Sequence, residues 1–414
     1  MKLLKTFSFF TVSFVLFLAL PLFISTFSVP VLTAEADQSQ IVTPTPTPQR
    51  QIVFVHGIKT SFRDIKNGTG GFQSLLIELP NHNYNINFFQ YYQDLGYQNQ
   101  NGNGCDSQPA PDTNISPLYA PSSNNTNKAI DPKTCDSQSA IAYNSTGLYN
   151  FISTLSSPVA IINYSMGAPI TRGWLTLAQN RQNDQTLNIV DTIISIQGVQ
   201  QGSYITLGAL PILKAANWSS PLLAAVIFGV QQLTGWNKDR PAEADLTPKS
   251  PWYQSTLPVN VPLRLHYYNF YSDIKVSARP QLFFRVWPSI GSTSLGDAVI
   301  LPGNSNSTAM PLLGGARFFP KGPGLDSHEY ALSSNHDLLL GNDLLNPLQK
   351  GSVLGVGTDV INDPINHVNL NKHLNDNNDA YKVDSCRSID GKVTIQQEIL
   401  HILANPVEAC PGET

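Results

Sequence analysis

Apolar residues occur along this chain in short runs, several of them rich in β-branched side chains. The clearest runs cover residues 51–58, 85–91, 159–164, 194–196 and 263–270. Runs of this length and composition are typical of buried strands. Because they alternate with helix-like stretches, we predict an α/β fold with a mostly parallel sheet and helices on both of its faces.

The run at 159–164 leads directly into Ser165, which is followed by Met166 and Gly167. A serine between a buried strand and a helix is typical of a nucleophile elbow, a tight turn that exposes the hydroxyl and directs the next backbone N–H at a developing oxyanion. Asn163 stands where the usual pattern has a second glycine. Ser-x-Gly also occurs at three other serines, but only Ser165 follows a continuous apolar run. We therefore predict that Ser165 is a nucleophile.

The run at 51–58 ends in His56-Gly57-Ile58. Glycine lets the backbone turn tightly at a strand end, so the N–H of Ile58 can point to the same place as the N–H of Met166. A His-Gly pair alone is also consistent with a strand end that carries a surface histidine. Together with the downstream serine, it predicts an oxyanion hole formed by the backbone of Ile58 and Met166.

These motifs, V-H-G-I at 55–58 and N-x-S-M-G at 163–167, resemble those of secreted bacterial lipases and esterases in the α/β-hydrolase superfamily. The resemblance implies an α/β-hydrolase fold and a catalytic triad in the chain order serine, acid, histidine. Residues 194–203 resemble the next strand and its loop, with Val199 and Gln200 in place of a usual Pro-His pair. Residues 245–252 resemble the segment that re-enters the core after a lid.

The same resemblance implies that His336 is the general base, because residues 334–340 resemble the histidine loop of these lipases. A histidine is required because its near-neutral pKa lets it accept and return a proton within a turnover. His328 is the nearest rival, and its other interpretation is a solvated loop residue. His367 and His373 lack the spacing of metal ligands and are expected on a polar surface. No zinc motif is present, and we expect neither a metal nor a cofactor.

Two aspartates are candidates for the acid that orients this histidine. Asp297 lies in a G-D-A-V-I-L-P segment that resembles the acid turn of the family, whereas Asp273 closely follows the run at 263–270. We predict Asp297 as the acid on this resemblance and keep Asp273 as the alternative. The other aspartate is then expected to be a turn or cap residue.

The segment from about 204 to 257 is the predicted lid or cap. It contains two runs, at 209–213 and 222–228, that are too apolar for a free surface loop. Such runs fit either cap helices packed on the core or a mobile lid that contacts a lipid interface. The expected substrate is accordingly a small-molecule or lipid ester.

Composition narrows the classes of function further. Only 13% of the 414 residues are charged, about half the usual share. The formal net charge is −4 and no basic stripe occurs, so nucleic-acid binding is not expected. About 365 residues follow the predicted leader and linker, enough for one large domain with insertions.

The N-terminus has the pattern of an export signal. Two lysines within Met1–Lys5 precede an uncharged apolar segment from Thr6 to Ala34, and Ala34-Glu35-Ala36 offers an A-x-A cleavage site. This predicts a signal peptide over residues 1–36 and a secreted protein, with a membrane signal anchor as the alternative. The Thr/Pro-rich residues 37–50 are a predicted linker, and residues 51–414 are the predicted hydrolase domain.

All four cysteines lie after this leader, at Cys105, Cys135, Cys386 and Cys410. An even number in an exported protein suits two structural disulfides. Pairing of neighbours would close an insertion at about 94–135 and tie the C-terminal helix, although the sequence alone allows three connectivities.

Taken together, the motifs predict a serine ester hydrolase that forms an acyl-enzyme. His336 would deprotonate Ser165, and the serine would attack an ester carbonyl. An amidase or acyltransferase with the same triad is one alternative. A non-catalytic exported binding protein on the same fold is another.

Overall fold

The structure is a computed structural model that describes parts of the chain between residues 49 and 406. The predicted leader, the cysteine-bracketed insertion and most of the predicted lid lie outside the described residues. The described residues are 49–57, 65–68, 71–89, 91, 141–156, 158–181, 184–200, 202–203, 245–247, 250, 252, 265–282, 285–286, 288–289, 291–295, 327–340, 358–386, 388–389 and 391–406.

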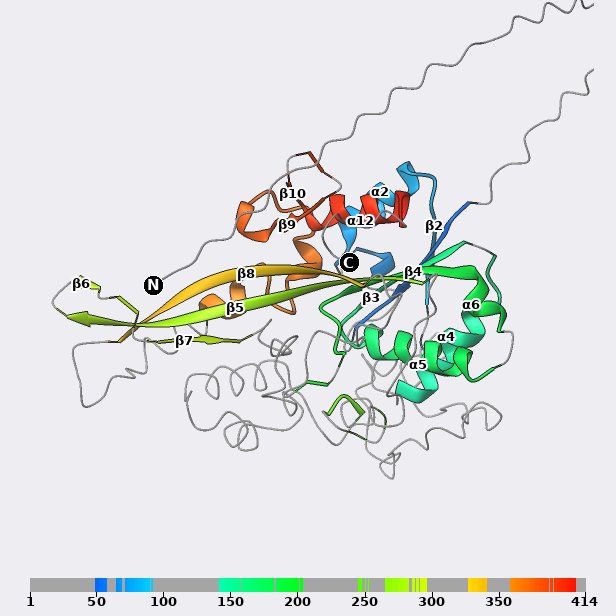
Figure 1. The fold of residues 1–414 in the computed structure, drawn as a ribbon, viewed down its shortest axis with the longest axis horizontal. Coiled ribbons are helices and arrows are strands. Elements are labelled where there is room, and N and C mark those ends of the chain that lie inside the picture. Colours follow the sequence, from blue (N-terminus) through cyan, green and yellow to red (C-terminus); the bar gives the residue numbers. More distant parts are fainter. Residues whose placement is uncertain are drawn as a thin grey trace, which may run out of the picture. The chain divides into compact units, whose positions relative to one another are not determined.

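An eight-stranded sheet forms the centre of this structure (Figure 1). Six strands are parallel and follow the order β2-β1-β3-β4-β5-β8. Their bounds are β1 (Gln51–Val55), β2 (Asn85–Phe88), β3 (Val159–Tyr164), β4 (Val190–Ile196), β5 (His266–Leu282) and β8 (Ser327–Leu340). Two short strands, β6 (Arg285–Val286) and β7 (Gly291–Ser294), pair with β5 in the antiparallel sense.

The central strands are apolar along almost their whole length. All six residues of β3 are buried, as are the last four of β1. Continuous burial of this kind requires cover on both faces of a parallel sheet. Helices supply it (Figure 1): α2 (Gln73–Asn81) and α12 (Ile395–Ala404) lie on one side, and α4 (Ile141–Ile152), α5 (Gly167–Gln179) and α6 (Gln185–Ile189) lie on the other. The predicted α/β class is therefore confirmed.

Strands β5 and β8 extend well beyond the other parallel strands (Figure 1). Phe270 and Tyr330 pair at the level where β3 and β4 end, and the two strands then run on together to Pro280 and Leu340. Residues 334–340, which the resemblance implied to be a loop, are strand in the structure. The physical reason is the alternation in β8, where Leu332 and Ser334 are buried and Ala331, Ser333 and Asn335 are exposed.

The C-terminal part of the chain packs against β8. It contains two short 3₁₀ helices, η3 (Leu370–Lys372) and η4 (Asp379–Tyr381), and a hairpin of β9 (Val383–Asp384) and β10 (Lys392–Val393). Helix α12 then begins with a capping box in which Thr394 and Gln397 satisfy each other's backbone N–H groups. The hydroxyl of Tyr330 donates to Glu398 at 2.6 Å and ties this helix to β8.

Residues just inside the C-terminal bound of the predicted lid belong to the core. Asp245, Leu246, Ser250 and Trp252 are buried. The backbone N–H of Ile141 donates to Asp245 at 3.0 Å, which joins this segment to the start of α4. These residues therefore pack in the core, and the bounds of the lid stay a prediction.

Cys386 takes part in a disulfide bond, and the other three cysteines lie outside the described residues. No helix among the described residues is both long and apolar enough to cross a bilayer.

Candidate active site

Ser165 occupies a strained turn between β3 and α5. Its φ angle is +52°, in the left-handed region that a residue with a side chain rarely adopts. The turn is held because the serine carbonyl accepts from the N–H groups of Ala168 and Val199, both at 3.1 Å. This is the geometry of a nucleophile elbow. It also leaves Met166 just before the first residue of α5, where its backbone N–H has no acceptor within the helix.

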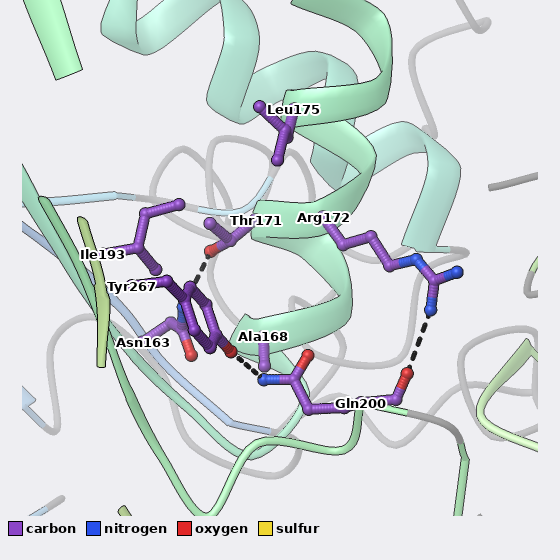
Figure 2. Close-up of a pocket in the computed structure, with 8 residues that line it drawn as sticks. All are labelled: Asn163, Ala168, Thr171, Arg172, Leu175, Ile193, Gln200 and Tyr267. Carbon is purple, nitrogen blue, oxygen red and sulfur yellow. Dashed lines mark hydrogen bonds between the residues drawn. The ribbon is translucent and has the colours of Figure 1, made fainter. Parts of the chain in front are cut away.

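The elbow brings α5 very close to β1. A Cβ added to Gly167 would lie 2.3 Å from the carbonyl oxygen of Val55, so only glycine fits there. Asn163, on the other side of the serine, is under no such constraint. Its Nδ2 lies 3.3 Å from the Oγ1 of Thr171, beside a cavity of about 10 Å³ (Figure 2).

Gly57 lies directly against the serine. A Cβ at this position would be 2.9 Å from the Cβ of Ser165 and 3.1 Å from the ring of Tyr164. The preceding His56 is buried rather than exposed at the surface, and its ring stacks on Tyr91 with the centroids 3.8 Å apart. The His-Gly turn therefore lies at the serine. Ile58, the other predicted oxyanion donor, is outside the described residues.

His367 is the histidine that contacts the serine. Its Nε2 lies 2.8 Å from the Oγ of Ser165, and its side chain is buried. The ring lies 5.4 Å from that of Tyr164 in a stacked arrangement, and the Tyr164 hydroxyl donates to the His367 carbonyl oxygen. This placement corrects two predictions, because His336 was expected at the serine and His367 on a polar surface.

His336 is instead part of β8. It lies six residues beyond Tyr330, which is at the level of the serine turn, and six residues of strand span about 20 Å. Its Nε2 is 2.6 Å from the Oδ2 of Asp363. That hydrogen bond raises the pKa of His336 above its ordinary value, against the lowering effect of burial. The side chain of His328 lies outside the described residues.

Asp363 was not singled out from the sequence, although it begins the loop that carries the histidine. We call residues 363–369 the His367 loop. Burial would raise the pKa of Asp363, but interactions with His336, Ser334 and the backbone N–H of Ile365 together hold it below its ordinary value. The carboxylate is thus ionised and paired at neutral pH.

Gln197 ties the His367 loop to the sheet from another direction. Its Nε2 donates to the carbonyl oxygen of Ile365 at 2.7 Å and to the Oγ of Ser272 at 2.9 Å. The residue is buried and has a φ of +47°, a second left-handed conformation close to the serine. No local sequence pattern marked it, because its role depends on two segments that lie far away in the chain.

Neither predicted acid is placed against His367. Asp297 lies outside the described residues. Asp273 accepts a hydrogen bond from Ser294 and lies 3.8 Å from the Nζ of Lys275. Because neighbouring side chains of a strand point to opposite faces, and Ser272 faces Gln197, Asp273 points away from the His367 loop. The identity of the aspartate that orients the catalytic histidine therefore remains a prediction.

Behind the elbow, a polar network supports the loop after β4 (Figure 2). The buried Arg172 donates to the carbonyl oxygen of Gln200 at 3.0 Å, and the Gln200 side chain donates to Ser195 and to the hydroxyl of Tyr267. Burial raises the pKa of Tyr267 well above its ordinary value, so the hydroxyl stays protonated. Gln200 therefore fixes the loop that supplies Val199 to the elbow.

The parallel sheet and the serine elbow together decide the fold. It is the α/β-hydrolase fold. No protein-family model and no curated protein match the sequence. Within the described residues, no group of three His, Cys, Asp or Glu side chains is arranged to hold a metal ion.

Solved structures similar to this chain include a metagenomic carboxyl esterase, MGS0156, with 12% identity, a TM-score of 0.30 and coverage of 56% of this chain and 53% of that one. The mature lipase BlEst2 of Bacillus licheniformis has 14% identity, a TM-score of 0.31 and coverage of 55% and 68%. Phospholipase PlaB of Legionella pneumophila has 10% identity, a TM-score of 0.30 and coverage of 59% and 50%. The chain thus spans about half the length of the esterase and the phospholipase.

Proposed function

We propose that this protein is a serine hydrolase that cleaves carboxylic esters. The observation that carries the proposal is the 2.8 Å contact between the Nε2 of His367 and the Oγ of a serine held in an elbow. A serine hydroxyl is a weak nucleophile until an adjacent base takes its proton. His367 is in position to take that proton.

The chemistry follows from this pair. His367 accepts the proton of Ser165 as the serine oxygen bonds to the ester carbonyl carbon, and it then returns the proton to the departing alcohol oxygen. Water, deprotonated by His367, then attacks the acyl carbon. As the acyl–Oγ bond breaks and the acid leaves, His367 returns the proton to the Oγ of Ser165. The N–H groups of Met166 and Ile58 stabilise the oxyanion of each tetrahedral intermediate, and an aspartate orients the imidazole.

A fluorophosphonate probe, which phosphonylates activated serines, tests this assignment. We expect the wild-type protein to be labelled at Ser165, and Ser165→Ala and His367→Ala to lose labelling and ester turnover while they remain folded. His373→Ala is the matched control, because His373 lies six residues further along the same segment and is partly exposed. Normal turnover in His367→Ala would contradict the proposal.

We propose lipid-like esters as the substrates. The support is the apolar character of residues 209–213 and 222–228, whose burial at a lipid interface would stabilise an open site. Activity on medium-chain and long-chain p-nitrophenyl esters should rise steeply once the substrate aggregates. Simple saturation on short soluble esters, with no preference for chain length, would make the protein a carboxylesterase with a static cap.

Export and disulfide pairing complete the proposal. Mass spectrometry of the exported protein should find a mature N-terminus at Asp37, with Cys105 joined to Cys135 and Cys386 joined to Cys410. Recovery of residues 1–36 in a membrane fraction would support the signal anchor instead.

A further inference from the structure

Asp363 shapes the start of the His367 loop. Its Oδ1 accepts the backbone N–H of Ile365 at 2.8 Å, and its own carbonyl oxygen accepts from the N–H of Asn366 at 3.0 Å. The side chain of Asp363 is 2% exposed. A carboxylate buried to this degree stays ionised only if a hydrogen-bonded partner compensates for the lost water.

His336 is that partner, and it belongs to a rigid element. Strand β8 is paired with β5 along its whole length, so the His336 backbone cannot move without breaking the sheet. The 2.6 Å bond from its Nε2 to the Oδ2 of Asp363 therefore fixes the loop to the sheet, four residues before the histidine that contacts Ser165.

We propose that His336 and Asp363 form a charged latch that positions His367 at the serine. The inference rests on the proposed function, since it assigns a role within the same site. Neither latch residue touches the serine. Both are positioning residues, and their effect reaches the serine through the backbone of the His367 loop.

The latch has a pH range of its own. Among the described residues, three other titratable groups lie around the pair: Asp359, Asp337 and Tyr381. Asp337 is ion-paired with Arg279 at 2.7 Å, and Asp376 lies close to Tyr381. Asp359 and Asp337 favour a protonated His336 and so raise its pKa. The latch is charged while His336 is protonated and Asp363 is ionised, so it weakens as pH rises through the raised pKa of His336. The wild-type kcat should therefore decline on the alkaline side.

His336→Gln separates the effect of the charge from that of the hydrogen bond, because the new amide can still donate to Asp363 but does not titrate. With p-nitrophenyl butyrate as substrate, we expect His336→Gln to keep the wild-type KM, to lose about threefold to tenfold in kcat near pH 6.5, and to lack the decline in kcat at alkaline pH.

Asp363→Ala should lose about 10²-fold in kcat, because a small displacement of a catalytic group has a large effect on the rate. His373→Gln is the matched control, since His373 and Asp376 form a partly exposed His-Asp pair at 3.7 Å; its profile should match the wild type.

Hydrogen exchange at the Ile365 amide tests the latch without catalysis. In a Ser165→Ala background, protection of this amide, corrected for the intrinsic pH dependence, should fall as pH rises, and should be low at every pH after His336→Ala. The latch proposal is wrong if His336→Gln keeps the wild-type pH profile of kcat and His336→Ala keeps the protection of the Ile365 amide. In that case, probe labelling of Ser165 would still support the proposed hydrolase. If Ser165 is never labelled, the proposed function fails, and the exchange experiment still decides whether the latch exists.

Discussion

The Nε2 of His367 lies 2.8 Å from the Oγ of Ser165, although 202 positions separate the two residues in the chain. The serine is placed by the elbow between β3 and α5, and the histidine by a loop that follows β8. Gln197 holds that loop at one point, and His336 holds it at another through Asp363. Changes to the holding groups should therefore reduce turnover more than they reduce stability.

Gln197 provides one test of this relationship. Gln197→Gly removes the amide that donates to Ile365 and Ser272, and it also relieves the left-handed backbone at φ +47°. We expect a loss of about tenfold in kcat. The melting temperature should fall only slightly, because relief of the left-handed backbone offsets part of the cost of the two lost buried hydrogen bonds. Steady-state kinetics and thermal unfolding on the same samples measure both effects.

Gln197→Glu is the companion variant, because it keeps the shape of the side chain and removes its donors. A carboxylate oxygen would then face the carbonyl oxygen of Ile365, so kcat should fall at least as far as in Gln197→Gly. Full turnover in both variants would show that the bridge does not position His367.

The two flanks of the serine should respond oppositely to substitution. Gly167→Ala places a Cβ 2.3 Å from the Val55 carbonyl oxygen and should destabilise the fold by about 1–3 kcal/mol, with a loss of activity. Asn163→Gly should leave turnover within about threefold of the wild type, because the asparagine makes only a long 3.3 Å bond to Thr171. Urea unfolding and ester turnover measure the contrast; equal effects at both positions would contradict it.

The latch should also contribute to stability in a defined pH window. Asp363 has a pKa below its ordinary 3.8, so its contribution is present above pH 3.8 and is lost as pH falls through the lowered value. His336 has a pKa above its ordinary 6.5, so its contribution is full below pH 6.5 and is lost as pH rises through the raised value. The gap in melting temperature between the wild type and His336→Gln should be largest between pH 4 and 6.5 and should shrink toward pH 9. A gap that does not change with pH would show that the charge has no role.

The acid of the triad is open to direct test. Asp297→Asn should lower kcat by orders of magnitude through a misoriented imidazole, whereas Asp273→Asn should have little effect, because Asp273 points toward Ser294. Turnover and circular dichroism of both variants measure this. The reverse outcome would assign the acid to Asp273.

The sequence by itself determined the elements that short-range patterns encode. The apolar run at 159–164 and the small residue at Gly167 predicted a strand, an elbow and a nucleophile, and the structure has that turn at Ser165. The His-Gly pair at 56–57 predicted a tight turn at the serine, and Gly57 lies there. These features follow from neighbouring residues, because strand burial and turn geometry are set within a few positions.

Only the tertiary structure decided which histidine meets the serine. His336 and His367 both follow Ser165 in the chain order that a triad requires, and the local motif favoured the wrong one. The choice depends on the length of β8, whose pairing with β5 carries His336 about 20 Å beyond the serine turn. The loop that follows β8 in the chain then places His367 against Ser165. The bridge from Gln197 to Ile365 arises in the same way, because the register of the sheet joins segments that no local pattern relates.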